Sequence, residues 1–163
     1  MTATDNRMPP PATILVIDIG GSNVKMLATG ETAPHTFRSG KRLTPTQMVD
    51  AVHELTAGWT YEAISIGYPG LVGAHGPHSE PGNLGPGWVG FNFAAAFDRP
   101  VRIINDAAMQ ALGNYDGGRM LFLGLGTGLG SALIADRVIV PLELGQLPYP
   151  GGPRLDHVLS QRG

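Results

Sequence analysis

Residues 14–28 read Ile-Leu-Val-Ile-Asp-Ile-Gly-Gly-Ser-Asn-Val-Lys-Met-Leu-Ala, and this stretch indicates the fold class more clearly than any other. Residues 14–17 are continuously apolar and mostly β-branched, which predicts a buried strand. Residues 18–23 are polar and contain a glycine pair, which predicts a tight turn. Because residues 24–28 are again mostly apolar, we expect a β-hairpin.

On the C-terminal side of this hairpin, helix and strand patterns alternate. Thr44-Pro45 opens a segment with apolar residues at helical spacing up to Leu55, which predicts a helix capped by Thr44. The loop at 68–90 is too long to be idle in a compact domain and is predicted to be functional or mobile. The other expected elements are strands at 63–67, 101–104, 120–123, 131–135 and 138–140, helices at 91–97 and 107–115, and a helical turn at 155–159. This order predicts a mixed α/β protein.

The composition excludes several classes of function. The chain has 163 residues, 42% of them hydrophobic, and a formal net charge of −2. This charge gives no electrostatic reason to expect nucleic-acid or membrane partners. There is no cysteine, which excludes disulfides, thiolate zinc sites and Cys nucleophiles. With no signal-peptide or membrane-span pattern either, we expect a cytoplasmic protein, whose proline-rich residues 1–12 form a flexible leader.

Two glycine turns link consecutive predicted strands, one at Gly20-Gly21 and one at 124–130. Such turns expose backbone N–H groups with no Cβ in the way, as phosphate-binding loops do. Neither matches a Walker loop or a dinucleotide-binding fingerprint. Each is equally open to the interpretation of a hairpin turn that needs positive φ. Together with Asp18 and Lys25 they indicate a phosphate cleft.

Two carboxylates stand at predicted strand ends. Asp18 follows a buried strand, where a carboxylate is costly unless it binds a metal such as hydrated magnesium or accepts hydrogen bonds in a turn. Asp106 lies at a strand-to-helix junction beside Asn105. It is placed either to cap the helix or to deprotonate a sugar hydroxyl that attacks a phosphoryl group.

The remaining polar residues are less informative. Tyr68-Pro69-Gly70 and residues 83–88 are suited to line a small-molecule cleft, although Trp88 is equally suited to anchor its loop in the core. The five histidines have no metal-binding spacing and are expected to be solvated. The eleven Lys and Arg residues are spread thinly along the sequence and show no basic track for a long polyanion.

Read in order, these segments resemble the sugar kinases of the ROK (repressor, open reading frame, kinase) family, and most of all its polyphosphate-type glucokinases. Residues 17–25 resemble the first phosphate motif of that family, and residues 123–132 resemble the second. Residues 104–107 resemble the segment that carries the catalytic aspartate. Residues 143–146 match the Glu-Leu-Gly-His sugar segment in three positions of four. The resemblance implies an actin-like fold, in which two ribonuclease-H-like domains enclose a cleft.

The resemblance also assigns roles to individual residues. Asp106 would be the general base in phosphorylation of the 6-hydroxyl of glucose, with polyphosphate or ATP as donor and Mg as cofactor. The implied sugar site consists of Pro69, Gly70, Asn83, Asn105, Asp106, Glu143 and Gln146. The implied site for the phosphoryl donor, with Asp18 as the Mg ligand, consists of Asp18, Gly20, Gly21, Ser22, Asn23, Lys25, Gly126, Thr127 and Gly128.

The sequence departs from the family pattern in three ways. Gln146 stands where the family has histidine, so an amide replaces an imidazole at the sugar. The zinc-binding cysteines of many members are missing, as they are in the polyphosphate-type branch. Relative to the family, we expect a C-terminally truncated chain, with a ribonuclease-H-like domain at 13–117 and part of a second domain at 118–163. The strands of that partial domain would leave an apolar face bare.

Two functions remain open at this point. The first is a sugar kinase whose partners are a small-molecule sugar and a phosphoryl donor. The alternative is a non-catalytic sugar-binding or regulatory remnant of the same family. The sequence leaves open whether the sugar is glucose, mannose or an N-acetylated hexosamine, and whether the protein is a homodimer.

Overall fold

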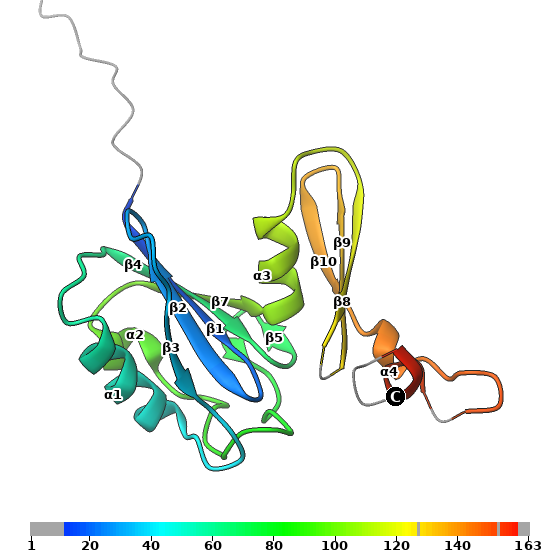
Figure 1. Ribbon diagram of the computed structural model, residues 1–163, viewed down its shortest axis with the longest axis horizontal. Helices are drawn as coiled ribbons and strands as arrows, with labels where there is room; N and C mark the ends of the chain where they lie inside the picture. Colours follow the sequence, from blue (N-terminus) through cyan, green and yellow to red (C-terminus); the bar gives the residue numbers. More distant parts are fainter. Residues whose placement is uncertain (1–11, 127, 153, 160–163) are drawn as a thin grey trace, which may run out of the picture.

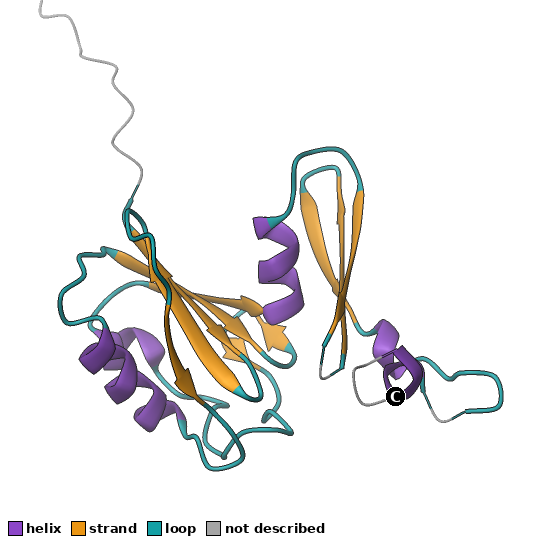
Figure 2. Ribbon diagram, in the orientation of Figure 1, coloured by secondary structure: helices purple, strands orange, loops and turns teal. Residues whose placement is uncertain are grey.

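The computed structural model describes residues 12–126, 128–152 and 154–159, so the expected leader lies outside the described residues except for Ala12. The chain forms a larger five-stranded sheet with helices on both faces and a smaller three-stranded sheet beside it (Figure 1). The predicted α/β class is confirmed (Figure 2). No helix among the described residues is long and apolar enough to cross a membrane.

The larger sheet has the strand order β3-β2-β1-β4-β7. β1, β2 and β3 are antiparallel neighbours, whereas β4 and β7 run parallel to β1. Because β1, β4 and β7 point the same way, their carboxyl ends meet at one edge of the sheet. The strands are β1 (Ile14–Ile19), β2 (Asn23–Ala28), β3 (His35–Arg38), β4 (Ala63–Tyr68) and β7 (Val101–Asn105).

The predicted hairpin is confirmed, with a tighter turn than expected. β1 continues through Asp18 and Ile19, and β2 begins at Asn23. Alternate residues of both strands are buried in the main core, which is typical of a sheet with one face covered. Asp18 is therefore a strand residue that pairs with Lys25, and its side chain lies on the face opposite the core.

The core face is covered by α1 (Pro45–Leu55) and α2 (Phe93–Phe97). The predicted cap of α1 is confirmed: the Gln47 N–H donates to Thr44 Oγ1 at 3.3 Å, and the Thr44 N–H donates to Gln47 Oε1 at 3.1 Å. This reciprocal capping box is worth about 1 kcal/mol to the helix. α3 (Asp106–Gly113) covers the opposite face of the sheet near β4.

The long loop after β4 has a defined structure, held by hydrogen bonds and by a buried side chain. It contains a minimal hairpin of β5 (Val72–Gly73) and β6 (Gly76–Pro77). Trp88 is fully buried, and its Nε1–H donates to the Gly85 carbonyl at 2.8 Å. The Glu80 carboxylate accepts the N–H groups of residues 87, 88 and 89, each at 3.1 Å. Trp88 is thus the core anchor of the loop.

The smaller sheet has the order β10-β9-β8, with all strands antiparallel. Its strands are β8 (Met120–Leu125), β9 (Leu129–Ala135) and β10 (Val138–Leu142), followed by a 3₁₀ turn, η1 (Leu144–Gln146), and α4 (Leu155–Leu159). One face packs on α3, where Ala132 and Ile134 meet Ala108 and Ala111. β8 extends to Leu125 and β9 begins at Leu129, so both strands reach into the predicted glycine turn of 124–130, and Gly124 and Gly130 pair within the sheet.

The other face of the smaller sheet is apolar and uncovered. Leu121, Leu123 and Leu125 of β8 are 50–60% exposed. Leu121 pairs with Leu133, which pairs with Val140, so the exposed residues form one continuous surface. The expectation of a bare apolar face is confirmed.

Candidate active site

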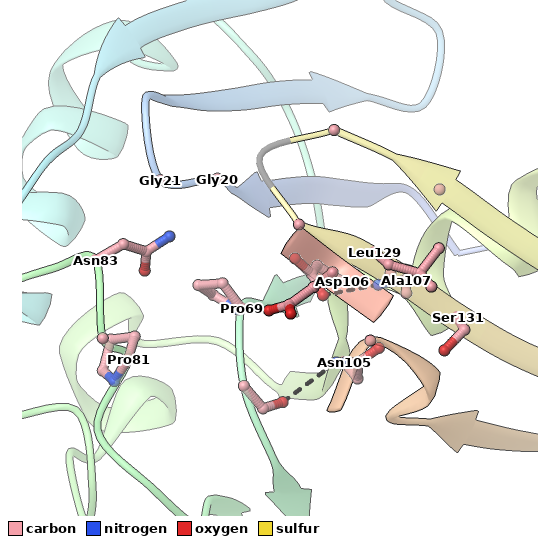
Figure 3. Close-up of a pocket in the computed structure, with 18 of the residues that line it drawn as sticks. Gly20, Gly21, Pro69, Pro81, Asn83, Asn105, Asp106, Ala107, Leu129 and Ser131 are labelled. Carbon is pink, nitrogen blue, oxygen red and sulfur yellow. Dashed lines mark hydrogen bonds between the residues drawn. The ribbon is translucent and has the colours of Figure 1, made fainter. Parts of the chain in front are cut away.

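A cleft of about 970 Å³ lies where the two sheets approach each other (Figure 3). Its walls come from the β1–β2 turn, the loop after β4, the start of α3, the β8–β9 hairpin, η1 and α4. Every predicted site residue that the structure describes lines it. These are Asp18, Gly20, Gly21, Ser22, Asn23, Lys25, Pro69, Gly70, Asn83, Asn105, Asp106, Gly126, Gly128, Glu143 and Gln146. Thr127 lies outside the described residues.

The two glycines of the first turn are closely packed. The Gly20 N–H donates to the Asn23 carbonyl at 2.9 Å, and a Cβ on Gly20 would lie 2.9 Å from that same oxygen. A Cβ on Gly21 would collide with the Asn83 side chain. Ser39, which follows β3, donates from its Oγ to the Gly20 carbonyl at 2.6 Å and holds the turn in place. The turn is therefore a rigid, backbone-lined wall of the kind that accepts phosphate oxygens.

Asp18 lies beside this turn, in a partly buried position. Burial raises the pKa of the Asp18 carboxyl, while the positive charge of Lys25 and a hydrogen bond with the Gln110 side chain lower it. Lys25 and Gln110 thus do not fully offset the cost of burying the negative charge of Asp18. This favours an additional positive partner for the carboxylate in the cleft.

The structure distinguishes the roles of Asn105 and Asp106. Asn105 caps α3, because its Oδ1 accepts the Ala108 N–H at 3.1 Å, and its Nδ2 donates to the Gly70 carbonyl at 3.3 Å. Capping therefore does not require Asp106, whose Oδ1 accepts the Ala107 N–H at 2.8 Å. Figure 3 shows the Asp106 carboxylate near the middle of the labelled cleft residues.

The environment of Asp106 suits a base. The pKa of its carboxyl is raised to about 6, mainly by burial; the Ala107 N–H lowers it, and the negative charges of Asp18 and Glu143 add to the rise. A carboxylate with a pKa near 6 is still ionised at neutral pH but takes up a proton more readily than an ordinary aspartate.

The opposite wall is held by close packing against α3. A Cβ on Gly130 would lie 3.1 Å from Ala107 Cβ, so a glycine lets β9 approach the start of the helix. The fully buried Ser131 donates to the Leu142 carbonyl at 3.0 Å and accepts the Leu144 N–H at 3.2 Å. These two bonds fix the segment that carries Glu143.

Several cleft residues were not predicted as site residues from the sequence, among them Gln110, Ser131 and Asp156. Gln110 lies one helical turn after Asp106, so the i, i+4 spacing on α3 could have indicated it. Ser131 and Asp156 carry no such signal, because they reach the cleft only through the packing of β9 and α4.

A magnesium ion fits this donor set. Magnesium prefers oxygen ligands and is usually held by one or two carboxylates together with waters and substrate phosphates. Within the described residues no group of three His, Asp or Glu side chains could hold a metal by itself. Asp18 is the residue suited to contact such an ion, because its carboxyl has a raised pKa and lies close to the glycine turn.

Comparisons with known proteins agree with this geometry. No protein-family model matches the chain. Polyphosphate glucokinase of Mycobacterium tuberculosis is 29% identical over 155 residues, which cover 83% of this chain and 58% of the relative. The chain thus spans less than two thirds of that relative's length.

Solved structures show the same fold. The inorganic polyphosphate/ATP-glucomannokinase of an Arthrobacter species superposes with a TM-score of 0.74 at 26% identity, covering 92% of this chain and 69% of that one. A ROK-family glucokinase of Streptomyces griseus, solved with glucose and AMPPNP, superposes with a TM-score of 0.72 at 20% identity, covering 92% and 58%. The actin-like, ribonuclease-H-like fold is confirmed, and this chain is similar in sequence to polyphosphate glucokinases and in fold to sugar kinases, including those of the ROK family.

Proposed function

We propose that the cleft is the active site of a sugar kinase that phosphorylates the 6-hydroxyl of glucose, with Asp106 as general base. The observation that carries the proposal is the position of Asp106. Its carboxylate lines the cleft together with the glycine turn of Gly20-Gly21 and with the polar group of Asn105, Glu143 and Gln146. We assign the turns to the phosphoryl donor and the polar group to the sugar.

The proposed reaction is an in-line displacement. Asp106 takes the proton of the sugar hydroxyl as its oxygen attacks the terminal phosphorus of the donor, and the bond from that phosphorus to the bridging oxygen breaks. ADP or a shortened polyphosphate leaves with the bond electrons. Phosphoryl transfer depends mostly on positioning and charge stabilisation. A magnesium ion at Asp18 would supply positive charge to the phosphate oxygens.

The sugar end offers both kinds of hydrogen-bonding group. Glu143 is an acceptor when ionised, and the amides of Asn105 and Gln146 offer donors. Pro69, Gly70 and Asn83 come from the loop on the other side of Asp106 and complete the assigned sugar site. We assign residues 13–117 to the first domain of the fold and 118–163 to the second, so the cleft lies between them.

A cluster of cations beside the donor end supports polyphosphate as a donor, with ATP as the other candidate. We define the basic rim as Lys25, Arg38, Lys41 and Arg42, all exposed. Arg38 pairs across the strands with the cleft residue Asn23, and Lys25 itself lines the cleft. Arg38, Lys41 and Arg42 lie within five consecutive positions, and the pairing of β2 with β3 places Lys25 on the neighbouring strand. Such a cluster of cations suits a donor longer than a nucleotide triphosphate.

The test is glucose 6-phosphate formation by the purified chain, with ATP and polyphosphate supplied separately. We expect turnover with at least one donor and a loss of about 100- to 10,000-fold in Asp106→Asn, on the scale of removing a general base. Asp50→Asn, on the exposed side of α1, is the matched control and should keep full activity. Glucose binding without turnover would instead support a sugar-binding remnant.

A further inference from the structure

We propose that Arg154 is a positioning residue that locks the Gln146 side chain in one orientation, so that its amide nitrogen donates to an oxygen of the sugar. This inference rests on the proposed function. It concerns the position at which this chain has glutamine where the resemblance implies histidine.

The contacts form a short relay along one edge of the cleft. Arg154 Nη1 donates to Gln146 Oε1. Arg154 Nε lies 3.4 Å from Asp156 Oδ1. That oxygen is buried and accepts no hydrogen bond from the described residues, so Arg154 is the cation that balances it. Gln146 and Asp156 both line the cleft.

The orientation of the amide follows from the chemistry of the guanidinium group. Arginine has only donors, so the group that faces it on Gln146 must be the amide oxygen. The two N–H groups of the amide are then left for other acceptors. A free glutamine presents either end of its amide, whereas a clamped one presents only the donor end.

The backbone supports this clamp. A Cβ on Gly145 would lie 3.1 Å from the Leu129 carbonyl and 3.2 Å from Asp156 Cβ, so η1 and the start of α4 are packed closely. The Leu155 N–H donates to the Leu147 carbonyl at 3.0 Å and ties the two segments together. These contacts hold the residues next to Arg154 and Gln146 close together.

The clamp gives the sugar end one hydrogen-bond acceptor and one donor. Glu143, at the start of η1, offers the acceptor, and the clamped Gln146, the last residue of η1, offers the donor. The ligand chemistry that satisfies both is a sugar diol, in which one hydroxyl donates to Glu143 and the other accepts from Gln146. Holding a flexible side chain in its binding orientation saves ordering entropy, equivalent to about two- to tenfold in affinity.

The first test is the steady-state kinetics of Arg154→Ala. We expect the KM for glucose to rise about tenfold, with kcat and the KM for the phosphoryl donor unchanged. Arg154→Lys should be intermediate, because one ammonium cannot bridge the amide and the carboxylate as a planar fork does. Arg99→Ala, which removes an exposed ion pair with Asp98, is the control and should leave all constants unchanged.

The second test separates the clamp from a general structural role. In a Gln146→Leu background, Arg154→Ala should produce no further rise in the glucose KM, because the amide that it orients is gone. An equal rise in both backgrounds would overturn the inference. The orientation of the amide can also be followed by NMR. The signals of the Gln146 side-chain NH₂ group are assigned by their loss in Gln146→Glu, and they should shift in Arg154→Ala. Signals that do not shift would also overturn the inference.

Failure of the proposed function would look different. A wild-type chain that neither binds nor phosphorylates glucose contradicts the proposed function itself. If the wild-type chain phosphorylates glucose and Arg154→Ala leaves the KM for glucose unchanged, only the clamp is contradicted.

Discussion

Asp18 and Asp106 face the same cleft from the ends of β1 and β7, and the negative charge of Asp18 contributes to the raised pKa of Asp106. The two strands are not neighbours, since β4 lies between them. The parallel arrangement of β1, β4 and β7 thus brings together two carboxylates that are 88 positions apart in the sequence.

This pairing predicts a pH dependence of activity. If Asp106 is the base, kcat/KM for glucose should rise about tenfold per pH unit below pH 6 and level off above it, because the pKa of Asp106 is about 6. Asp18→Asn removes one of the charges that raise this pKa and should move the acidic limb to lower pH. The profile is measured with saturating donor. A limb that stays in place in Asp18→Asn would contradict the coupling of the two carboxylates.

The raised pKa of Asp106 also predicts an effect on stability. The folded state binds its proton more tightly than the unfolded state, whose pKa is near 3.8, so the carboxyl stabilises the fold most at low pH. That contribution is lost as the pH rises from about 4 to about 6. At pH 8, Asp106→Asn should therefore raise the free energy of unfolding, by at most about 3 kcal/mol.

Urea unfolding at pH 8 and at pH 4 measures this gain. The increase should be much smaller at pH 4, where the native carboxyl is already protonated in the fold. Equal gains at both pH values would show that the burial of the charge is not its cause. Asp50→Asn is again the control, since its side chain is exposed on α1.

The basic rim predicts a charge-dependent donor preference. Replacing Arg38, Lys41 and Arg42 together by alanine should raise the KM for long-chain polyphosphate at least tenfold and leave the KM for glucose unchanged. The effect should shrink at 0.5 M salt, because exposed charges are screened over a few Å there. Arg99→Ala with Arg102→Ala removes two exposed cations elsewhere and serves as the control. An equal loss with ATP would show that the rim does not distinguish the donors.

The features that could be predicted from the sequence are those that depend on local patterns. The hairpin of residues 14–28 and the cap at Thr44 each depend on residues that follow one another in the sequence, and both were predicted. β3 was not, because His35–Arg38 is short, half-exposed and lacks an apolar run. Asp156 depends on how separate elements pack, and its neighbours in the cleft are distant in the sequence, so no local pattern indicates it. Gln110 and the rim residues Arg38, Lys41 and Arg42 do follow local patterns, but their positions beside the cleft depend on the fold.

The first glycine turn predicts a sharp difference between two glycines. Gly20→Ala would place a Cβ 2.9 Å from the Asn23 carbonyl, and backbone atoms there cannot move aside. We expect a loss of about 1–3 kcal/mol in unfolding free energy and weaker donor binding, on the scale of an overpacked core. Gly58→Ala meets no atom within 4 Å and has no positive φ, so it should be neutral. Thermal unfolding with and without donor measures both effects, and a neutral Gly20→Ala would contradict the described turn.

The uncovered face of the smaller sheet predicts how the isolated chain behaves in solution. Exposed apolar surface of this kind binds hydrophobic dyes and favours self-association. Replacing Leu121 and Leu123 by threonine keeps the β propensity and removes two side chains that are 53% and 50% exposed. We expect lower ANS fluorescence and a smaller sedimentation coefficient at high protein concentration, with a change in Tm of only a few degrees. Val89→Thr removes a similarly exposed but isolated apolar side chain and should change neither measurement. Dye binding that persists in the double variant would place the exposed apolar surface elsewhere on the chain.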